Sequence, residues 1–242
     1  MELERLFNYS WKFYRKNISI VTIFSVLFLM AAIIPLFVAL PTYMSLGGIY
    51  VRTESIPELS LVDIAVTLFV YLISLFIIAE AVVNINLIIK SKRTSVPIPS
   101  QMIKNMGRYT VKVFLALVIL ELLIFAIQLL LFDKPFNTLI YPIAVGIISF
   151  LFFYIAPAIV IDESNIFNAI VRSSNHAMKK PQMIIVWAII GFVVLSLVKL
   201  IFDLILPNFS AYLVLLVNSL FVLPYLLILQ TQMYMEKYPL AR

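Results

Sequence analysis

The chain has 242 residues, of which 63% are hydrophobic and 12% are charged, and its formal net charge is +6. Soluble domains are about 45–50% apolar and about 25% charged, so this composition excludes a water-soluble fold and indicates an integral membrane protein. Cysteine is absent and there is one histidine, which excludes disulfides, thiolate metal sites and multi-histidine metal sites, and we expect no cofactor.

Six apolar runs are long enough to cross a membrane as helices. A spanning helix needs about 20 mostly apolar residues to cross a hydrocarbon core of roughly 30 Å. The runs are continuous rather than alternating, which favours helices over a β-barrel. We therefore predict an all-α, polytopic membrane protein in which residues 1–242 form one transmembrane domain. In chain order, the predicted spans are Ile18–Leu40, Leu61–Ile89, Thr110–Phe132, Thr138–Ile161, Met183–Leu206 and Tyr212–Met235.

The connections predict how the six spans pair. Residues 133–137 and 207–211 are so few that the spans on either side of them must form antiparallel hairpins. The connection 41–60 is longer but too short for a domain. We expect three antiparallel hairpins, one from each successive pair of spans.

Basic residues predict the orientation. Fifteen of the 18 lysines and arginines fall at the two termini and around the connections after the second and fourth spans. Arg52, Lys134 and Lys199 are the three that fall toward the other side. Because loops rich in lysine and arginine stay in the cytoplasm, we expect a multi-pass protein of the cell membrane with both termini cytoplasmic.

Three segments beside the spans have the spacing of amphipathic helices: residues 2–16, 97–109 and 164–179. Each places apolar side chains on one face and bases elsewhere, which is typical of helices that lie in the membrane interface. We expect membrane lipids with anionic head groups to be partners of these bases. The candidate contacts are Lys12, Arg15, Lys16, Lys104, Arg108, Arg172, Lys179 and Lys180.

Polar residues inside the spans form a second set of candidates: Glu80, Glu121, Gln128 and Asn218. Ionisable groups cost roughly 2.5–3.5 kcal/mol each at the centre of a span, so they are candidates for function. Glu121 lies about nine residues beyond Lys112, which places it near the midplane. One interpretation is a proton or cation site between the second, third and sixth spans. The favoured alternative is that Glu121 fixes helix packing, because no second acid or base falls at its depth. Lys199 and Asp203, four residues apart, are expected to pair.

The stretch 156–174, APAIVIDESNIFNAIVRSS, joins a proline-containing apolar helix to an acidic turn and an amphipathic helix with Ala, a base and Ser. This pattern resembles six-helix prokaryotic membrane proteins of the YciC-like group, which is similar to the membrane domain attached to some glycerophosphodiester phosphodiesterases. The resemblance implies the six-helix architecture. It carries over no catalytic residue, because the phosphodiesterase activity sits in a separate soluble domain.

Three functions remain open. The first is a non-catalytic module: a scaffold, assembly partner or lipid-organising protein that self-associates or docks another membrane protein. The second is a small transporter or channel that uses Glu121 and Glu80, with kinks at Pro35, Pro142, Pro157 and Pro224. The third is a lipid-directed enzyme or accessory, suggested by the resemblance alone. We expect no nucleic acid as a partner, because Trp11 and Tyr14 fit interfacial anchors better than base-stacking platforms.

Overall fold

The computed structural model describes residues 2–35, 43–46, 49–52, 61–94, 106–131, 134 and 137–236. These residues are mainly helical, with one small antiparallel β-hairpin. In chain order the elements are α1 (Glu2–Lys16), α2 (Ile18–Ile33), β1 (Tyr43–Leu46), β2 (Ile49–Arg52), α3 (Leu61–Thr94), α5 (Met106–Leu131), α6 (Asn137–Phe152), α7 (Ile155–Val160), α8 (Ile166–Lys179), α9 (Pro181–Ile205), the 3₁₀ turn η2 (Pro207–Phe209), α10 (Ser210–Val217), the π-helical segment η3 (Asn218–Val222) and α11 (Leu223–Met235).

The described part of the chain contains five segments that are long and apolar enough to cross a membrane. They are Ala65–Lys92, Met106–Leu131, Asn137–Val160, Pro181–Ile205 and Pro207–Met235. A sixth span results when α1 and α2, which meet at a bend of 88°, are taken together. The prediction of an all-α polytopic membrane protein is confirmed.

Some boundaries differ from those expected. α3 continues to Thr94, and α5 begins at Met106, four residues before the predicted span. Residues 106–109 of the expected amphipathic segment 97–109 therefore belong to the span itself, and residues 97–105 lie outside the described part. Lysine and arginine are good helix formers, so a basic flank extends a span instead of ending it. The β-hairpin, with Tyr43 opposite Arg52, falls in the connection 41–60, for which no strand was predicted.

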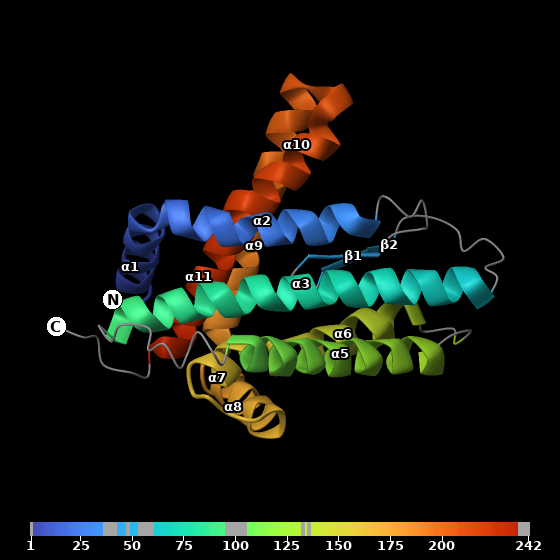
Figure 1. The fold of residues 1–242 in the computed structure, drawn as a ribbon, viewed down its shortest axis with the longest axis horizontal. Helices are drawn as coiled ribbons and strands as arrows, with labels where there is room; N and C mark the ends of the chain where they lie inside the picture. Colours follow the sequence, from blue (N-terminus) through green and yellow to red (C-terminus); the bar gives the residue numbers. More distant parts are fainter. Residues whose placement is uncertain are drawn as a thin grey trace.

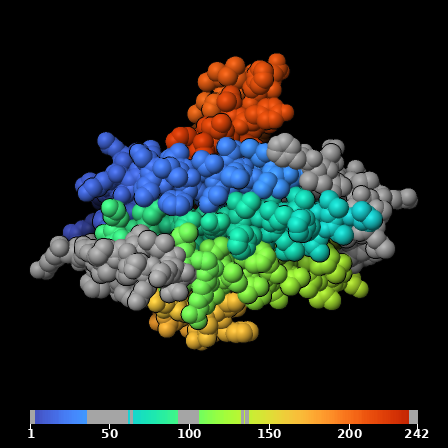
Figure 2. Space-filling model, viewed as in Figure 1, coloured from blue at the N-terminus to red at the C-terminus, as the bar shows by residue number. Residues whose placement is uncertain are grey.

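The spans form two sets that cross one another (Figure 1). In the first set α2 packs on α3, α3 on α5, and α5 on α6. In the second set α9 packs on α10 and α11, and α10 projects beyond α2, as the space-filling view in Figure 2 also shows. Because membrane helices tilt by up to about 40° from the bilayer normal, both sets can cross one bilayer by tilting in opposite senses.

One end of the bundle holds α1, α7, α8, the end of α3 and the start of α5 (Figure 1). We call it the basic end, because the bases of these elements gather there. It also holds the tightest packing: all six residues of α7 are buried, and so is most of α3 from Ala79 to Ile89 and of α11 from Leu226 to Met235. By contrast, α9 has three buried residues, Met183, Ile184 and Gly191. Its outer surface is left for lipid, which solvates apolar side chains as well as a protein interior does.

Candidate functional site

The two acids predicted inside the membrane lie at different depths. Glu80 is half-buried on α3 and Glu121 is half-buried on α5. α3 and α5 are antiparallel, and Phe76 and Phe114 lie at the same height along the two helix axes, because their rings meet edge-on with centroids 5.5 Å apart. From that level Glu80 lies four residues toward the basic end and Glu121 seven residues toward the other end. At 1.5 Å per residue they are about 16 Å apart along the helix axis, so the structure does not bring them together.

The two amides predicted with them lie apart as well. Asn218 begins η3 and is buried, and its Oδ1 has no hydrogen-bond partner among the described residues. Gln128 is half-buried near the end of α5. η3 packs against α2 and α9, whereas α5 packs against α3, α6, α7 and α8. The four intramembrane candidates therefore do not converge on one cavity, and the role of each stays a prediction.

The predicted head-group bases fall into three groups. Five are exposed and make no ion pair with the described residues: Lys12, Arg15, Lys16, Arg108 and Lys179. Two are paired instead, Arg172 with Asp162 at 2.8 Å and Lys180 with Glu236 at 2.7 Å. Lys104 lies outside the described residues. The predicted pair of Lys199 and Asp203 is confirmed, with 3.1 Å between Nζ and Oδ2.

Asp162 joins three elements at the turn between α7 and α8. Its side chain is 2% exposed, and one of its oxygens accepts hydrogen bonds from Nη1 of Arg172 and from the hydroxyl of Tyr234, both at 2.8 Å. Arg172 lies on α8 and Tyr234 on α11. Because a buried carboxylate is costly unless its oxygens are paired, this acid fixes α8 against the last span.

Glu163 follows with φ of 53°, in the left-handed region that residues other than glycine rarely adopt. Lys90, near the end of α3, places Nζ 2.8 Å from Oε1 of Glu163. The hydroxyl of Tyr109 on α5 donates a second hydrogen bond to this carboxylate. The hydrogen bond from Lys90 is the main cause that lowers the pKa of Glu163 below its ordinary 4.5, so the group is ionised at neutral pH.

Side chains also satisfy the carbonyl groups that the end of α7 leaves open. Nζ of Lys90 donates to the carbonyl oxygen of Val160 at 3.1 Å, and Oγ of Ser164 donates to that of Ala158 at 2.7 Å. Nζ of Lys112 on α5 donates to the carbonyl oxygen of Ser164 at 3.1 Å. Cations are favourable at a helix C-terminus, where carbonyl oxygens concentrate negative charge. The acidic turn 161–165 is thereby clamped between α3 and α5.

Ser173 bridges the break between α6 and α7. Its hydroxyl donates to the carbonyl oxygen of Leu151 at 2.7 Å and accepts from the backbone N–H of Tyr154 at 2.9 Å. Pro157 has no N–H, which frees the carbonyl of Phe153, and Nε2 of Gln230 on α11 donates to that oxygen at 2.5 Å. The acid, base and serine of the stretch 156–174 are thus parts of one folded unit that joins the fourth span to α8.

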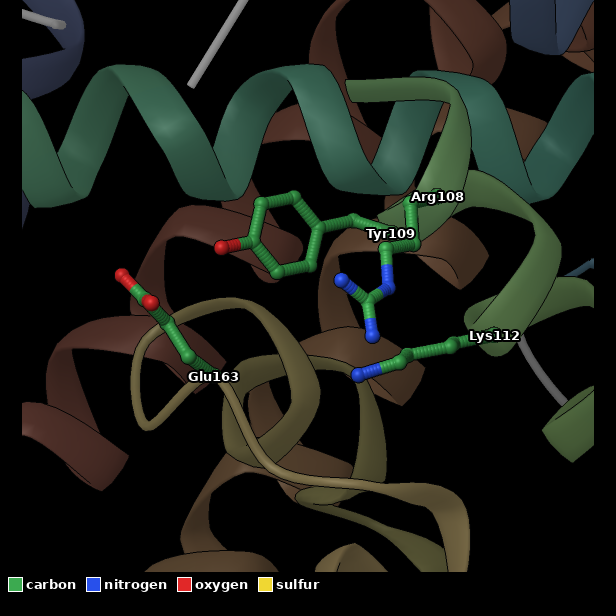
Figure 3. Close-up of a pocket in the computed structure, with 4 residues that line it drawn as sticks. All are labelled: Arg108, Tyr109, Lys112 and Glu163. Atoms are coloured by element: carbon green, nitrogen blue, oxygen red, sulfur yellow. The ribbon is translucent and has the colours of Figure 1, made fainter. Parts of the chain in front are cut away.

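A pocket of about 140 Å³ lies between the start of α5 and the acidic turn, lined by Arg108, Tyr109, Lys112 and Glu163. Figure 3 shows the guanidinium of Arg108 and the ammonium of Lys112 pointing into the same space, while the carboxylate of Glu163 turns toward the hydroxyl of Tyr109. With Lys90 bound to Glu163, three cations surround one carboxylate. The pocket therefore carries an excess of positive charge.

Sequence reasoning named Arg108 as a head-group contact but did not group it with Lys90, Lys112 and Glu163. The contacts that form the site join residues 52 and 70 positions apart, and no local spacing reports such a separation. One signal was present: the acids of the turn 161–165 and the bases at the ends of the second and third spans were all predicted on the same membrane face.

Within the described residues, no group of three or more histidine, aspartate or glutamate side chains is placed to hold a metal ion. No family model matches the chain, and comparisons with curated proteins and with solved structures find no similar protein. The likeness of residues 156–174 to the YciC-like group stays a prediction, and the geometry of the basic end is what supports a function.

Proposed function

We propose that the chain is a non-catalytic membrane module that gathers anionic lipids at its basic end, which faces the cytoplasm. The observation that carries this proposal is the outer face of α8. Its bulky apolar side chains point away from the protein: Phe167 is 77% exposed, Met178 is 60% exposed, and Val171 is exposed between them. Lys179 is exposed on the same helix.

The membrane interface is a favourable surrounding for such a face. An interfacial helix buries its apolar side chains among acyl chains, and its bases reach the phosphate groups of the lipids. α8 turns its small residues toward the protein, since Ala169, Ser173 and Ala177 are its buried positions. Ile166 and Ile170 add half-buried contacts, so the exposed Phe167, Val171 and Met178 are not needed for packing on the bundle and are available to lipid.

α1 supplies more positive charge to the same end. Lys12, Arg15 and Lys16 are exposed, while its apolar face packs on α11. Each base near an anionic membrane surface contributes about 1 kcal/mol of attraction. Together with Arg108 and Lys179 they give five bases for head groups, and an excess of bases at one side is typical of the cytoplasmic side.

The orientation has a direct test, because the chain has no cysteine to remove. A single cysteine is placed at Lys179 in one variant and at Lys134 in another, and whole cells are treated with a maleimide that cannot cross the membrane. We expect Lys179→Cys to react only after the membrane is opened, and Lys134→Cys to react in intact cells. The reverse pattern would refute the proposed orientation.

Lipid gathering is tested with the full chain in vesicles of phosphatidylcholine with one fifth phosphatidylglycerol. Spin-labelled forms of both lipids report which one is slowed at the protein surface. We expect at least a twofold preference for phosphatidylglycerol, which falls toward one when Lys12, Arg15, Lys16, Arg108 and Lys179 are all changed to glutamine.

The control variant changes Lys134 and Lys199, at the opposite end of the bundle, to glutamine and is expected to keep most of the preference. An equal slowing of both lipids by the unchanged protein would overturn the proposal. A preference that survives 1 M salt without loss would also count against it, because exposed charges are screened at that concentration.

A further inference from the structure

We propose that the pocket between α5 and the acidic turn is a binding site for one phosphate group, supplied by the head group of an anionic phospholipid. This inference rests on the proposed function, because it places one of the lipids that gather at the basic end, the most tightly bound one, in this pocket. In this half-open pocket two bases from one helix point into the same space.

The two bases have hydrogen-bond donors to spare. Arg108 makes no ion pair with the described residues, and its planar guanidinium can bind two oxygens of one phosphate. Nζ of Lys112 donates to the carbonyl oxygen of Ser164, and an ammonium has three donors. Both side chains point into the pocket (Figure 3).

The carboxylate in the pocket makes no ion pair with either base, although Lys112 is near enough to add to the effect of Lys90 in lowering the pKa of Glu163. Lys90 and Tyr109 already bind Glu163, which turns its oxygens toward Tyr109 and away from Arg108 and Lys112 (Figure 3). Glu163 is paired with Lys90, so the two further cations Arg108 and Lys112 leave a net positive charge for a ligand. The excess of positive charge favours a phosphate and disfavours an ammonium group.

The position of the pocket selects a lipid over a soluble ion. Arg108 and Lys112 lie in the first turns of a 26-residue spanning helix, the depth at which head-group phosphates lie. α8, whose exposed apolar side chains fit among acyl chains, begins two residues after Ser164.

The test measures lipid binding to the purified full chain in an uncharged detergent by native mass spectrometry. Phosphatidylglycerol is added to the unchanged protein and to the variants Arg108→Gln and Lys179→Gln, which remove one exposed base each from the same end. We expect one molecule of phosphatidylglycerol to bind more tightly than further molecules. Its affinity should fall about tenfold or more in Arg108→Gln and less than twofold in Lys179→Gln.

Lys112 also supports the acidic turn, so its contribution is tested with two substitutions. Lys112→Arg keeps the charge and is expected to retain the bound lipid, whereas Lys112→Gln is expected to lose it. If Lys112→Gln also lowers the melting temperature, the comparison of Arg108→Gln with Lys179→Gln decides alone, because Arg108 holds no other described element in place.

A second arm adds inorganic phosphate in competition. Lipid that stays bound at a large excess of phosphate supports the assignment. Displacement at equal concentration would overturn the lipid part and leave a site for soluble phosphate. Equal losses in Arg108→Gln and Lys179→Gln would overturn the site itself, while the lipid preference measured in vesicles would still support the proposed function. If the preference for phosphatidylglycerol in vesicles were also absent, both the phosphate site and the proposed function would be refuted.

Discussion

The two amphipathic helices at the basic end bury opposite kinds of residue. α1 turns large side chains toward the protein: Leu6, Phe13 and Tyr14 are buried, and the helix packs on α11. α8 turns small ones toward the protein, namely Ala169, Ser173 and Ala177. Of its large apolar residues, Phe167, Val171 and Met178 remain exposed, while Ile166 and Ile170 are half-buried against the core. Both helices show the same alternation of apolar and basic residues in sequence, so this alternation does not tell which medium covers the apolar face.

Residue size distinguishes the two cases. Small side chains let two helix backbones approach closely, and this is how membrane helices pack when lipid removes the hydrophobic driving force. Large side chains on a helix at the interface can be covered either by protein or by acyl chains. The aromatic contacts of α1 show the first case, since the rings of Trp11 and Tyr14 meet that of Tyr225 on α11, with centroids 5.8 and 5.7 Å away.

The largest expected effect compares one substitution at two places. Phe13→Ala removes a side chain that is 7% exposed and leaves a cavity under α1, at a cost of about 3 kcal/mol in the free energy of unfolding. Phe167→Ala removes a side chain that is 77% exposed and that the proposed function places among lipids, and it should cost less than about 0.5 kcal/mol. Unfolding by a denaturing detergent, followed by circular dichroism, measures both. Equal costs would mean that α8 is covered by protein as α1 is.

The next effect concerns the polar contacts of α8. They hold this helix against the bundle, whereas α1 is held by large apolar side chains. Asp162→Ala deprives the buried hydroxyl of Tyr234 and the guanidinium of Arg172 of their acceptor, and we expect a loss of about 2–3 kcal/mol in the free energy of unfolding. Lys199→Met breaks the exposed pair with Asp203 and should cost at most about 0.5 kcal/mol. Thermal unfolding in detergent measures both, and a small cost for Asp162→Ala would show that packing alone holds α8.

Two neighbouring serines test the junction between α6 and α8. Ser173→Ala leaves the N–H of Tyr154 without its acceptor, and should cost about 1–2 kcal/mol. Ser174→Ala is the matched control, because its hydroxyl makes a longer contact of 3.4 Å with the carbonyl oxygen of Leu151, and should cost less than half as much. Amide hydrogen exchange at Tyr154 gives an independent measurement, since it should accelerate in the first variant alone. Equal exchange in both variants would remove the bridging role of Ser173.

The spans were predictable from sequence for a simple reason. Lipid leaves backbone groups no partner except those of the helix itself, so length and apolarity are enough to place a span to within a few residues. The predicted start at Thr110 was four residues late because the helix continues through Arg108, a charged residue that is a good helix former. The crossing of the two sets of spans was not predictable, since every apolar face is equally compatible with lipid.

The candidate site was predictable only in outline. Membrane orientation put the acids of the turn 161–165 and the bases of α3 and α5 on one face, but not in contact. Placing Lys90 on Glu163 needs the left-handed turn at Glu163, and neither Glu163 nor its neighbours in sequence predict a positive φ. Intramembrane Glu80 and Glu121 drew attention because isolated acids are rare in spans, yet the dense polar network lies at the end of the bundle.

The smallest expected effect is the dependence on pH of the link between Glu163 and Lys90. The pKa of Glu163 is lowered in the folded protein, chiefly by the hydrogen bond from Lys90. A lowered pKa means that the contribution to stability is complete above 4.5, the ordinary value, and is lost as the pH falls through the lower folded-state pKa. Because the side chain is 53% exposed, we expect less than about 1 kcal/mol at neutral pH.

Comparing the unchanged protein with Glu163→Gln isolates this contribution, because the two proteins share every other carboxyl group. The free energy of unfolding should be larger for the unchanged protein at pH 7, and the difference should shrink toward zero below pH 4.5. A difference that stays constant down to pH 3 would mean that the variant loses geometry rather than charge. In that case the left-handed turn, and not the ion pair with Lys90, would be what positions the pocket beside α8.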